Sequence, residues 1–460
     1  MLSGRSYRWL LVAILAGGLA IRLAAGAWWQ SRLPAGKPFG FPDSEGYWEL
    51  GRTIAQGRPY EYGPERYAIF RTPGYPALLA GLFLIGGNDP PVLWGRALSA
   101  VLGTAAVAGV AALARVLFDE RTALVAAAMA AVYPETIALS VFVLSEAPLC
   151  PLLVWQLVAW TKAWQTRAGQ TRVLPWAALA GALAGLATLM RPSWLLFVPF
   201  ASGLGLVAAW IGKPPSATQG AAYSAVHRHL VISGVMLAAM CLTLAPWWIR
   251  NYLVAGRFVP TTLQVGASLY DGLGPPATGA SDMRFVPDFV AEQRAGEARA
   301  GGNPAGTFED RLDRRMRDAS LAWARQNPTR VVALAGIKFL RMWSPLPNAA
   351  ELSSSTLRLV LALTYTPALA LALAGAWRFA RRDWPYLLCL LPAVYFTCLH
   401  VIFVSSIRYR QPAMLVLIVL AAGAVGGWLA RKGRGGERER GREGDRDPSP
   451  PLPLAPLDTP

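Results

Sequence analysis

Apolar runs of about twenty residues are the feature that most limits what this chain can fold into. A helix needs about 20 apolar residues to cross the ~30 Å hydrocarbon core of a bilayer. Only 15% of the residues are charged and 54% are hydrophobic, whereas soluble domains carry about 25% charged residues. We therefore predict an all-α polytopic membrane protein with about ten transmembrane helices, and at most about 13. The predicted spans are 9–29, 92–114, 122–140, 142–161, 174–190, 193–211, 231–249, 357–377, 385–404 and 411–430.

Two shorter apolar stretches, 74–87 and 331–343, are better explained as interfacial or re-entrant segments. If 331–343 crossed the membrane, the cluster Arg378, Arg381 and Arg382 would lie outside, against the positive-inside rule. We therefore expect this stretch to lie flat on the outer face, with both termini in the cytoplasm. The polar segments 30–91 and 250–330 then become a first and a large outer loop.

The chain divides into a transmembrane domain, residues 1–430, and a tail, residues 431–460. The first apolar run is longer than a signal peptide's and ends in Trp28 and Trp29, so we expect it to be a retained helix. The tail mixes charge, glycine and proline with little to bury, which predicts a disordered cytoplasmic segment.

The net charge of +17 does not indicate nucleic-acid binding, because Lys and Arg fall mostly in short connectors that set membrane topology. The four cysteines lie inside apolar runs without a CxxC pair, as buried small hydrophobes do. No Asp-x-Asp motif occurs in the first outer loop, so a divalent metal is not indicated, and no glycine-rich loop would hold a nucleotide. The sequence therefore indicates no particular cofactor.

Conspicuous polar residues gather on the predicted outer side. Carboxylates are costly within hydrocarbon and generally face a cavity or a partner, so such a group suits a site at the outer membrane–water boundary. The candidates are Asp43, Glu45, Arg71 and Tyr75 in the first outer loop, Glu135, Glu146 and Arg191 at span ends, and Arg250, Asn251, His400, Arg408, Tyr409 and Arg410 near the later spans.

Several blocks of this sequence resemble one family. The block FPDSEGYWELGRTIAQG at 41–57 resembles the first outer loop of GT-C glycosyltransferases. FRTPGYPALLAGLFLIGG at 70–87 is similar to a short proline-containing segment of their bacterial dolichyl-phosphate-mannose-type and aminoarabinose-transferase-type members. LSEAPL, APWWIRNYLVAGRFVPTT and RYRQPAML also look like blocks of that group, and their order and membrane side agree.

The resemblance implies a multi-pass enzyme of the bacterial inner membrane. It would move a hexosyl or pentosyl group from a polyprenyl-phosphate-linked donor to a lipid, glycan or protein acceptor, with inversion, on the extracytoplasmic face. Its first-loop acid maps onto Asp43 as the base, with Glu45 competing two residues away and Glu146 orienting the acceptor. A carboxylate can take a proton from an acceptor, and arginines bind phosphate well. Arg71, Tyr75 and the run Arg408, Tyr409 and Arg410 are then the donor-phosphate candidates.

Simpler roles compete with each assignment. Asp43 could cap a helix beginning near Ser44, and Glu146 could pair with Arg191 only to hold helices together. Arg71 could be an interfacial arginine. Arg250 and Asn251 could flank an aromatic belt, and a packed His400 is more plausible than a metal ligand.

A transporter or flippase for a lipid-linked saccharide would use the same charges without chemistry, although no duplicated halves are visible. An assembly protein that binds partners through its outer loops is a third possibility.

Overall fold

The computed structural model describes residues 3–34, 36–166, 171–211, 219–301, 305–347 and 354–444. Of the described residues, 79% are helical. Across these ranges the only strand-like pairing is an isolated antiparallel bridge between Tyr62 and Tyr67. The predicted all-α class is confirmed.

Eight described helices or helix pairs are long and apolar enough to cross a membrane, and a bent pair makes a ninth. The pair is α5 (Glu120–Val132) with α6 (Pro134–Val141), bent by 55°. The other predicted span, 142–161, falls on α7 (Glu146–Gln165), so about ten spans are compatible with the structure. The eight are α1 (Gly4–Arg32), α4 (Val92–Leu117), α8 (Val173–Met190), η1 (Pro192–Trp194) with α9 (Phe197–Ile211), α10 (Gln219–Ala255), α15 (Ser355–Phe379), α16 (Trp384–Leu388) with α17 (Leu391–Ile402), and α18 (Ile407–Gly444).

The break between α5 and α6 has a local cause. Pro134 stands at the start of α6, so it cannot donate a hydrogen bond that would continue α5. The last carbonyls of a helix need other partners, and the buried guanidinium of Arg22 donates to Ala130 O at 3.2 Å and to Ala131 O at 2.9 Å. Arg22, which lies in the first span, therefore donates hydrogen bonds to the carbonyls left open where α5 ends.

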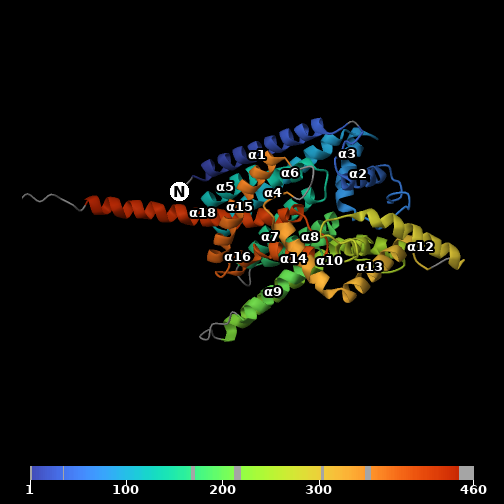
Figure 1. Ribbon diagram of the computed structural model, residues 1–460. Coiled ribbons are helices and arrows are strands. Elements are labelled where there is room, and N and C mark those ends of the chain that lie inside the picture. Colours follow the sequence, from blue (N-terminus) through green and yellow to red (C-terminus); the bar gives the residue numbers. More distant parts are fainter. Residues whose placement is uncertain are drawn as a thin grey trace, which may run out of the picture.

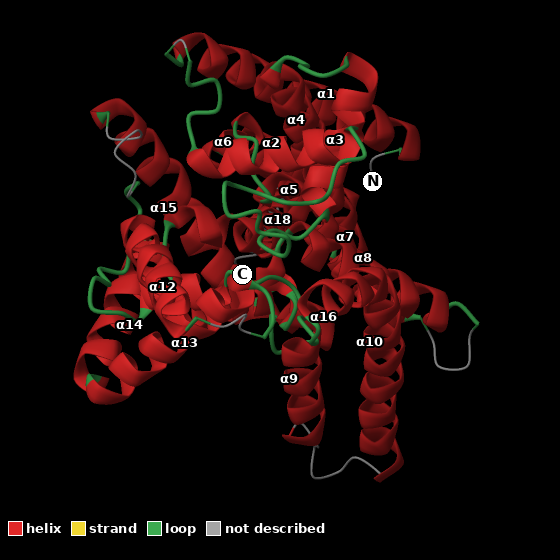
Figure 2. Ribbon diagram, turned by 90° about the vertical axis from the view of Figure 1, so that its right-hand side faces the viewer, coloured by secondary structure: helices red, strands yellow, loops and turns green. Residues whose placement is uncertain are grey.

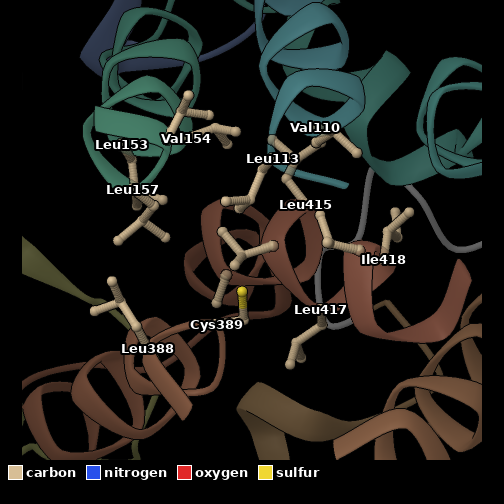
Figure 3. Packing of buried hydrophobic residues seen from close by; sticks show 14 of the residues in the cluster. Val110, Leu113, Leu153, Val154, Leu157, Leu388, Cys389, Leu415, Leu417 and Ile418 are labelled. Atoms are coloured by element: carbon tan, nitrogen blue, oxygen red, sulfur yellow. The ribbon is translucent and has the colours of Figure 1, made fainter. Parts of the chain in front are cut away.

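The hydrophobic core lies where α4, α7 and α18 meet (Figure 3). Leu153 and Leu157 of α7 face Leu113 of α4 and Leu415 of α18 across this core. Nearly every residue of α7 between Glu146 and Thr161 is buried. A helix enclosed on all sides is apolar all round, which explains why the sequence identifies this segment as a span.

Helices α8 and α10 pack closely because α8 presents glycines to the backbone of its neighbour. A Cβ at Gly181 would overlap Met236 O, and a Cβ at Gly185 would lie 2.6 Å from Thr243 Cβ. The spacing Gly-x-x-x-Gly places both on one face, as is common where membrane helices approach. By contrast, nothing lies within 4 Å of a Cβ built at Gly234 of α10.

We expect Gly181→Ala to destabilise the protein by about 1–3 kcal/mol, because the added methyl group must push α8 away from α10. The measurement is the thermal unfolding midpoint of purified protein in detergent. Gly234→Ala is the matched control and should leave the midpoint unchanged or raise it slightly. Equal midpoints for the two variants would contradict the close approach.

The outer-loop helices gather at the end of the molecule opposite the N-terminus, where Figure 1 shows α2, α3, α12 and α13. The stretch 331–343, expected to lie flat, falls on α14, which buries Leu334, Lys338 and Met342 and exposes Val332 and Leu340. The outer-loop elements are α2 (Pro42–Ala55), α3 (Gly74–Gly86), α11 (Val265–Gly272), η2 (Met283–Phe285), α12 (Val286–Ala300), α13 (Phe308–Gln326) and α14 (Pro328–Trp343).

At the other end, α9 and α10 form a hairpin that projects from the body (Figure 2). Helix α18 also extends away from the body, to Gly444. The sequence predicts disorder from residue 431, so the described part of the tail differs from that expectation. Its many Arg and Glu residues are good helix formers and allow the last span to continue. Residues 445–460 lie outside the described residues.

The two outer loops are joined at Glu309, in the first turn of α13. Its buried Oε2 accepts hydrogen bonds from Ala68 N at 2.9 Å and Ile69 N at 3.0 Å. Burial is the main cause that raises the pKa of Glu309 to about 7. The two amide donors and Arg250 act to lower this pKa, and nearby Asp313 acts to raise it. The carboxyl therefore titrates near neutral pH.

This shift predicts a pH-dependent stability. A carboxyl whose pKa is raised on folding stabilises the protein below its unfolded pKa and loses that contribution as pH rises through the folded pKa. Between about pH 5.5 and pH 8 the protein should lose roughly 2 kcal/mol relative to Glu309→Gln, which does not titrate. Unfolding midpoints of both proteins across this range measure the difference. Parallel pH profiles would show that Glu309 does not titrate there.

Candidate functional site

Five charged side chains from distant parts of the chain meet at the end of the bundle that carries the polar segments 30–91 and 250–330. Arg71 Nη2 donates to Asp43 Oδ1 at 2.8 Å, and Arg408 Nη2 lies 3.6 Å from Asp43 Oδ2. Arg408 Nε lies 2.7 Å from Glu146 Oε1, and Arg191 Nη1 lies 3.1 Å from the same oxygen. Arg408 thus bridges two carboxylates. We call these five residues the Asp43 centre.

Three of the five lie at helix N-termini. Asp43 stands in the first turn of α2 and Glu146 in the first turn of α7, while Arg408 is the second residue of α18. The N–H groups at a helix start lack partners within the helix and carry partial positive charge. Three such ends at one place favour an anion. They also help to accommodate two neighbouring carboxylates.

The structure contradicts the alternative in which Asp43 only caps a helix. The residue at the N-cap of α2 is Phe41, and no side chain caps that helix. Asp43 instead keeps 43% of its side chain exposed while it binds Arg71. Partial burial alone would raise the pKa of Asp43, but Arg71 and Arg408 outweigh it and hold that pKa below its usual range. Asp43 is therefore ionised at neutral pH.

Glu146 is the most enclosed member of the centre, with 1% of its side chain exposed. Among the described side chains, neither of its oxygens has a partner with hydrogen-bond alignment, although two arginines lie close. Buried carboxylates normally accept several hydrogen bonds. The ion pair with Arg191 was expected as a purely structural alternative, and it exists. It nevertheless leaves Glu146 able to accept a hydrogen bond from a polar ligand.

Aromatic rings fix the arginines of the centre. Arg71 lies 4.9 Å from the ring centroid of Tyr47 and equally far from that of Phe70. Tyr75, predicted as a donor-phosphate residue, is wholly buried and packs edge-on against Tyr47 with centroids 5.3 Å apart. It therefore supports Tyr47 and does not reach the centre directly.

Tyr409 has a similar place beneath the other two arginines. Its ring centroid is 5.1 Å from the guanidinium carbons of Arg191 and of Arg408. His400 stacks on the same ring at 4.3 Å, and its Nδ1 lies 2.8 Å from Val404 O. His400 is thus a packed histidine, as expected.

Arg410 does not belong to the Asp43 centre, contrary to its predicted phosphate role. It is completely buried, and its Nη2 donates to Glu135 Oε1 at 2.7 Å. Its Nη1 donates to Met342 O and Ser344 O at 2.8 and 2.6 Å. Glu135 also accepts from Gln411 at 2.7 Å. Arg410 and Glu135 therefore tie α18 to α6 and to the end of α14.

The other candidates lie apart from the centre. Arg250 Nη1 donates to Ala68 O at 2.6 Å, and Asn251 Nδ2 donates to Val259 O at 3.1 Å, so both hold loop backbone. Glu45 is exposed on α2. Gln264, which accepts from Arg71 Nη1 at 3.4 Å, has no signal in the sequence. Within the described ranges, no group of three or more His, Cys, Asp or Glu side chains could hold a metal ion.

Replacing Arg410 with methionine should destabilise the protein by about 3–5 kcal/mol, because Glu135 would be left as a buried carboxylate without its cation. The loss should appear as a lower unfolding midpoint or reduced yield of folded protein. The double variant Arg410→Met with Glu135→Gln should recover much of the stability. A single variant as stable as the parent would contradict this structural role.

Comparisons with known proteins bear on the family and the fold of this chain. A family model described as dolichyl-phosphate-mannose-protein mannosyltransferase matches residues 71–247. A sequence comparison with curated proteins found no match.

Among solved structures, the archaeal oligosaccharyltransferase AglB from Archaeoglobus fulgidus, solved with an inhibitory peptide and a dolichol-phosphate, aligns with a TM-score of 0.59 and 15% identity, over 97% of this chain and 53% of that one. The apo form of the Archaeoglobus fulgidus oligosaccharyltransferase gives a TM-score of 0.59 and 16% identity, over 94% and 52%. This chain thus spans about half the length of those proteins. The chain has the GT-C fold of membrane glycosyltransferases.

Proposed function

We propose that the protein is a glycosyltransferase that moves a sugar from a polyprenyl-phosphate donor to an acceptor hydroxyl or amide on the extracytoplasmic face of a bacterial inner membrane. The observation that carries this proposal is that Arg71 and Arg408 both form ion pairs with Asp43. These contacts set a carboxylate next to two cations at one end of a membrane bundle. A general base and a phosphate site are the two parts that this reaction requires.

The charge of the centre supports an anionic donor. Three arginines (Arg71, Arg191 and Arg408) face two carboxylates (Asp43 and Glu146), so the five groups carry one excess positive charge. The three helix N-termini add to it. A phosphate would balance this excess, and arginine suits it because the guanidinium can bind two of its oxygens together. The fold relative AglB was solved with a dolichol-phosphate, which supports this donor class.

Donor binding would also prepare the base. In the free protein the arginines hold the pKa of Asp43 below its usual range. A bound phosphate would pair with Arg71 and Arg408 and weaken their electrostatic attraction to Asp43. The pKa of Asp43 would then rise, and its carboxylate would become a stronger base. Base strength then develops only when the donor is present.

In the proposed reaction, Asp43 takes the proton from the acceptor while the acceptor atom attacks the anomeric carbon. The bond between that carbon and the phosphate oxygen breaks, and the polyprenyl phosphate leaves with the bonding electrons beside Arg71 and Arg408. Displacement from the opposite face inverts the anomeric carbon. Glu146, whose oxygens have no aligned donor among the described side chains, accepts a hydrogen bond from the substrate and orients it.

The test is transfer of radiolabelled sugar from polyprenyl-phosphate donors by purified protein. Asp43→Asn should lower the rate by about 10²–10⁴-fold and leave the unfolding midpoint within a few degrees of the parent. Glu45→Gln, two residues away on the same helix and exposed, is the matched control and should retain activity. Equal activity of Asp43→Asn and the parent would exclude Asp43 as the base. A parent protein that moves lipid-linked saccharide across vesicles but never transfers sugar would identify a transporter.

A further inference from the structure

The large outer loop, extended here to include helix α14 (residues 250–343), holds the two backbone segments that carry Arg71 and Arg408. Both arginines contact Asp43, yet neither is on that loop. Arg71 follows the segment Ala68–Ile69, of which Ile69 is buried, and Arg408 follows the turn between α17 and α18. One carboxylate and one ammonium group from the loop reach these two segments.

On the Arg71 side, the contact is Glu309 of α13. A single oxygen, Oε2, accepts from both Ala68 N and Ile69 N. Ile69 is fully buried, and its carbonyl accepts from Leu263 N at 3.0 Å. The backbone two residues before Arg71 is therefore fixed on both its donor and acceptor sides by the large outer loop.

On the Arg408 side, the contact is Lys338 of α14, which is completely buried. Its Nζ donates to Ile402 O at 2.6 Å and Val401 O at 3.3 Å, at the end of α17, and to Gly272 O at 2.8 Å, at the end of α11. These carbonyls at helix ends need external donors, and a cation suits them. In return, Ser405 Oγ donates to Lys338 O at 2.7 Å, three residues before Arg408.

Burying a carboxyl or an ammonium group is costly unless it is bonded. The bonds made by Glu309 Oε2 and by Lys338 Nζ go to backbone groups of other segments, while Glu309 Oε1 has no partner among the described residues. Glu309 and Lys338 lie in the two consecutive helices α13 and α14. One continuous part of the chain therefore contacts both segments that carry the arginines.

We infer that Glu309 and Lys338 are positioning residues, through which the large outer loop sets where Arg71 and Arg408 stand around Asp43. The inference rests on the proposed function for its consequence in catalysis, namely that the loop determines donor-phosphate affinity. Its structural content, the coupling of α13 and α14 to the two arginine segments, stands independently of that function.

The experiment compares full-length variants in lipid nanodiscs. Glu309→Ala removes the acceptor of two amides, whereas Glu309→Gln keeps a carbonyl oxygen that can accept from both. Lys338→Met removes the three donors and retains most of the side-chain volume. Glu292→Ala is the matched control, because Glu292 pairs with Arg315 on the same loop and that contact touches neither arginine segment.

Two measurements are made on each variant. Hydrogen exchange of amides 70–72 should speed up in Glu309→Ala, and exchange of amides 405–409 should speed up in Lys338→Met. The dissociation constant of undecaprenyl phosphate, and the KM for the sugar donor where transfer occurs, should rise about 10- to 100-fold in both, since small misplacements of a binding group have effects of this size. Glu309→Gln and Glu292→Ala should stay within about twofold of the parent.

The outcomes separate the two proposals. If the parent transfers no sugar, the proposed function fails while the exchange data still decide the positioning role. Unchanged exchange in Glu309→Ala and Lys338→Met, or equal changes in Glu292→Ala, would overturn the inference. A Glu309→Gln variant as impaired as Glu309→Ala would overturn it as well. Should Glu309→Ala not fold, Glu309→Asp, which is one methylene too short to keep both bonds, replaces it with the same expected changes.

Discussion

The physical constraint on which this structure depends is the placing of charges at the edge of a hydrocarbon layer. A carboxylate or guanidinium there must be paired or bonded. Arg408 meets this requirement for two carboxylates at once, since it contacts both Asp43 and Glu146. Through that bridge the first outer loop, the start of α7 and the start of α18 have to meet at one point. The aromatic rings of Tyr47 and Tyr409 then fix the arginines from the apolar side.

Buried arginines perform two different tasks in this chain, and the difference is visible in their partners. Arg22 and Arg410 donate to backbone carbonyls at helix ends, and Arg410 also neutralises Glu135. They hold broken or tilted helices together, so their bonding capacity is largely used. Arg71 and Arg408 have carboxylates as partners and remain partly exposed, at 16% and 22%. Such arginines can exchange a carboxylate for a phosphate, which is what the proposed reaction requires.

The large outer loop links the buried charges that bond backbone to the arginines that contact carboxylates. It is helical and polar, and it contributes no residue to the Asp43 centre, yet its buried Glu309 and Lys338 bond the backbone next to Arg71 and Arg408. Under the proposed function, these bonds would let the loop set the geometry of the phosphate site.

The sequence by itself determined the helical membrane class, because apolar length is a local property. It also marked all five members of the Asp43 centre as candidates, because charged residues are rare in membrane segments. It did not show that Arg408 and Arg410 have separate roles. Two residues apart on a helix point about 200° apart, so one reaches Asp43 while the other is buried against Glu135. Nor did it indicate Glu309, Lys338 or Gln264, whose partners lie more than sixty residues away. Only the packing of the helices decides which distant backbone meets which side chain, since periodicity records which face is buried and not what lies against it.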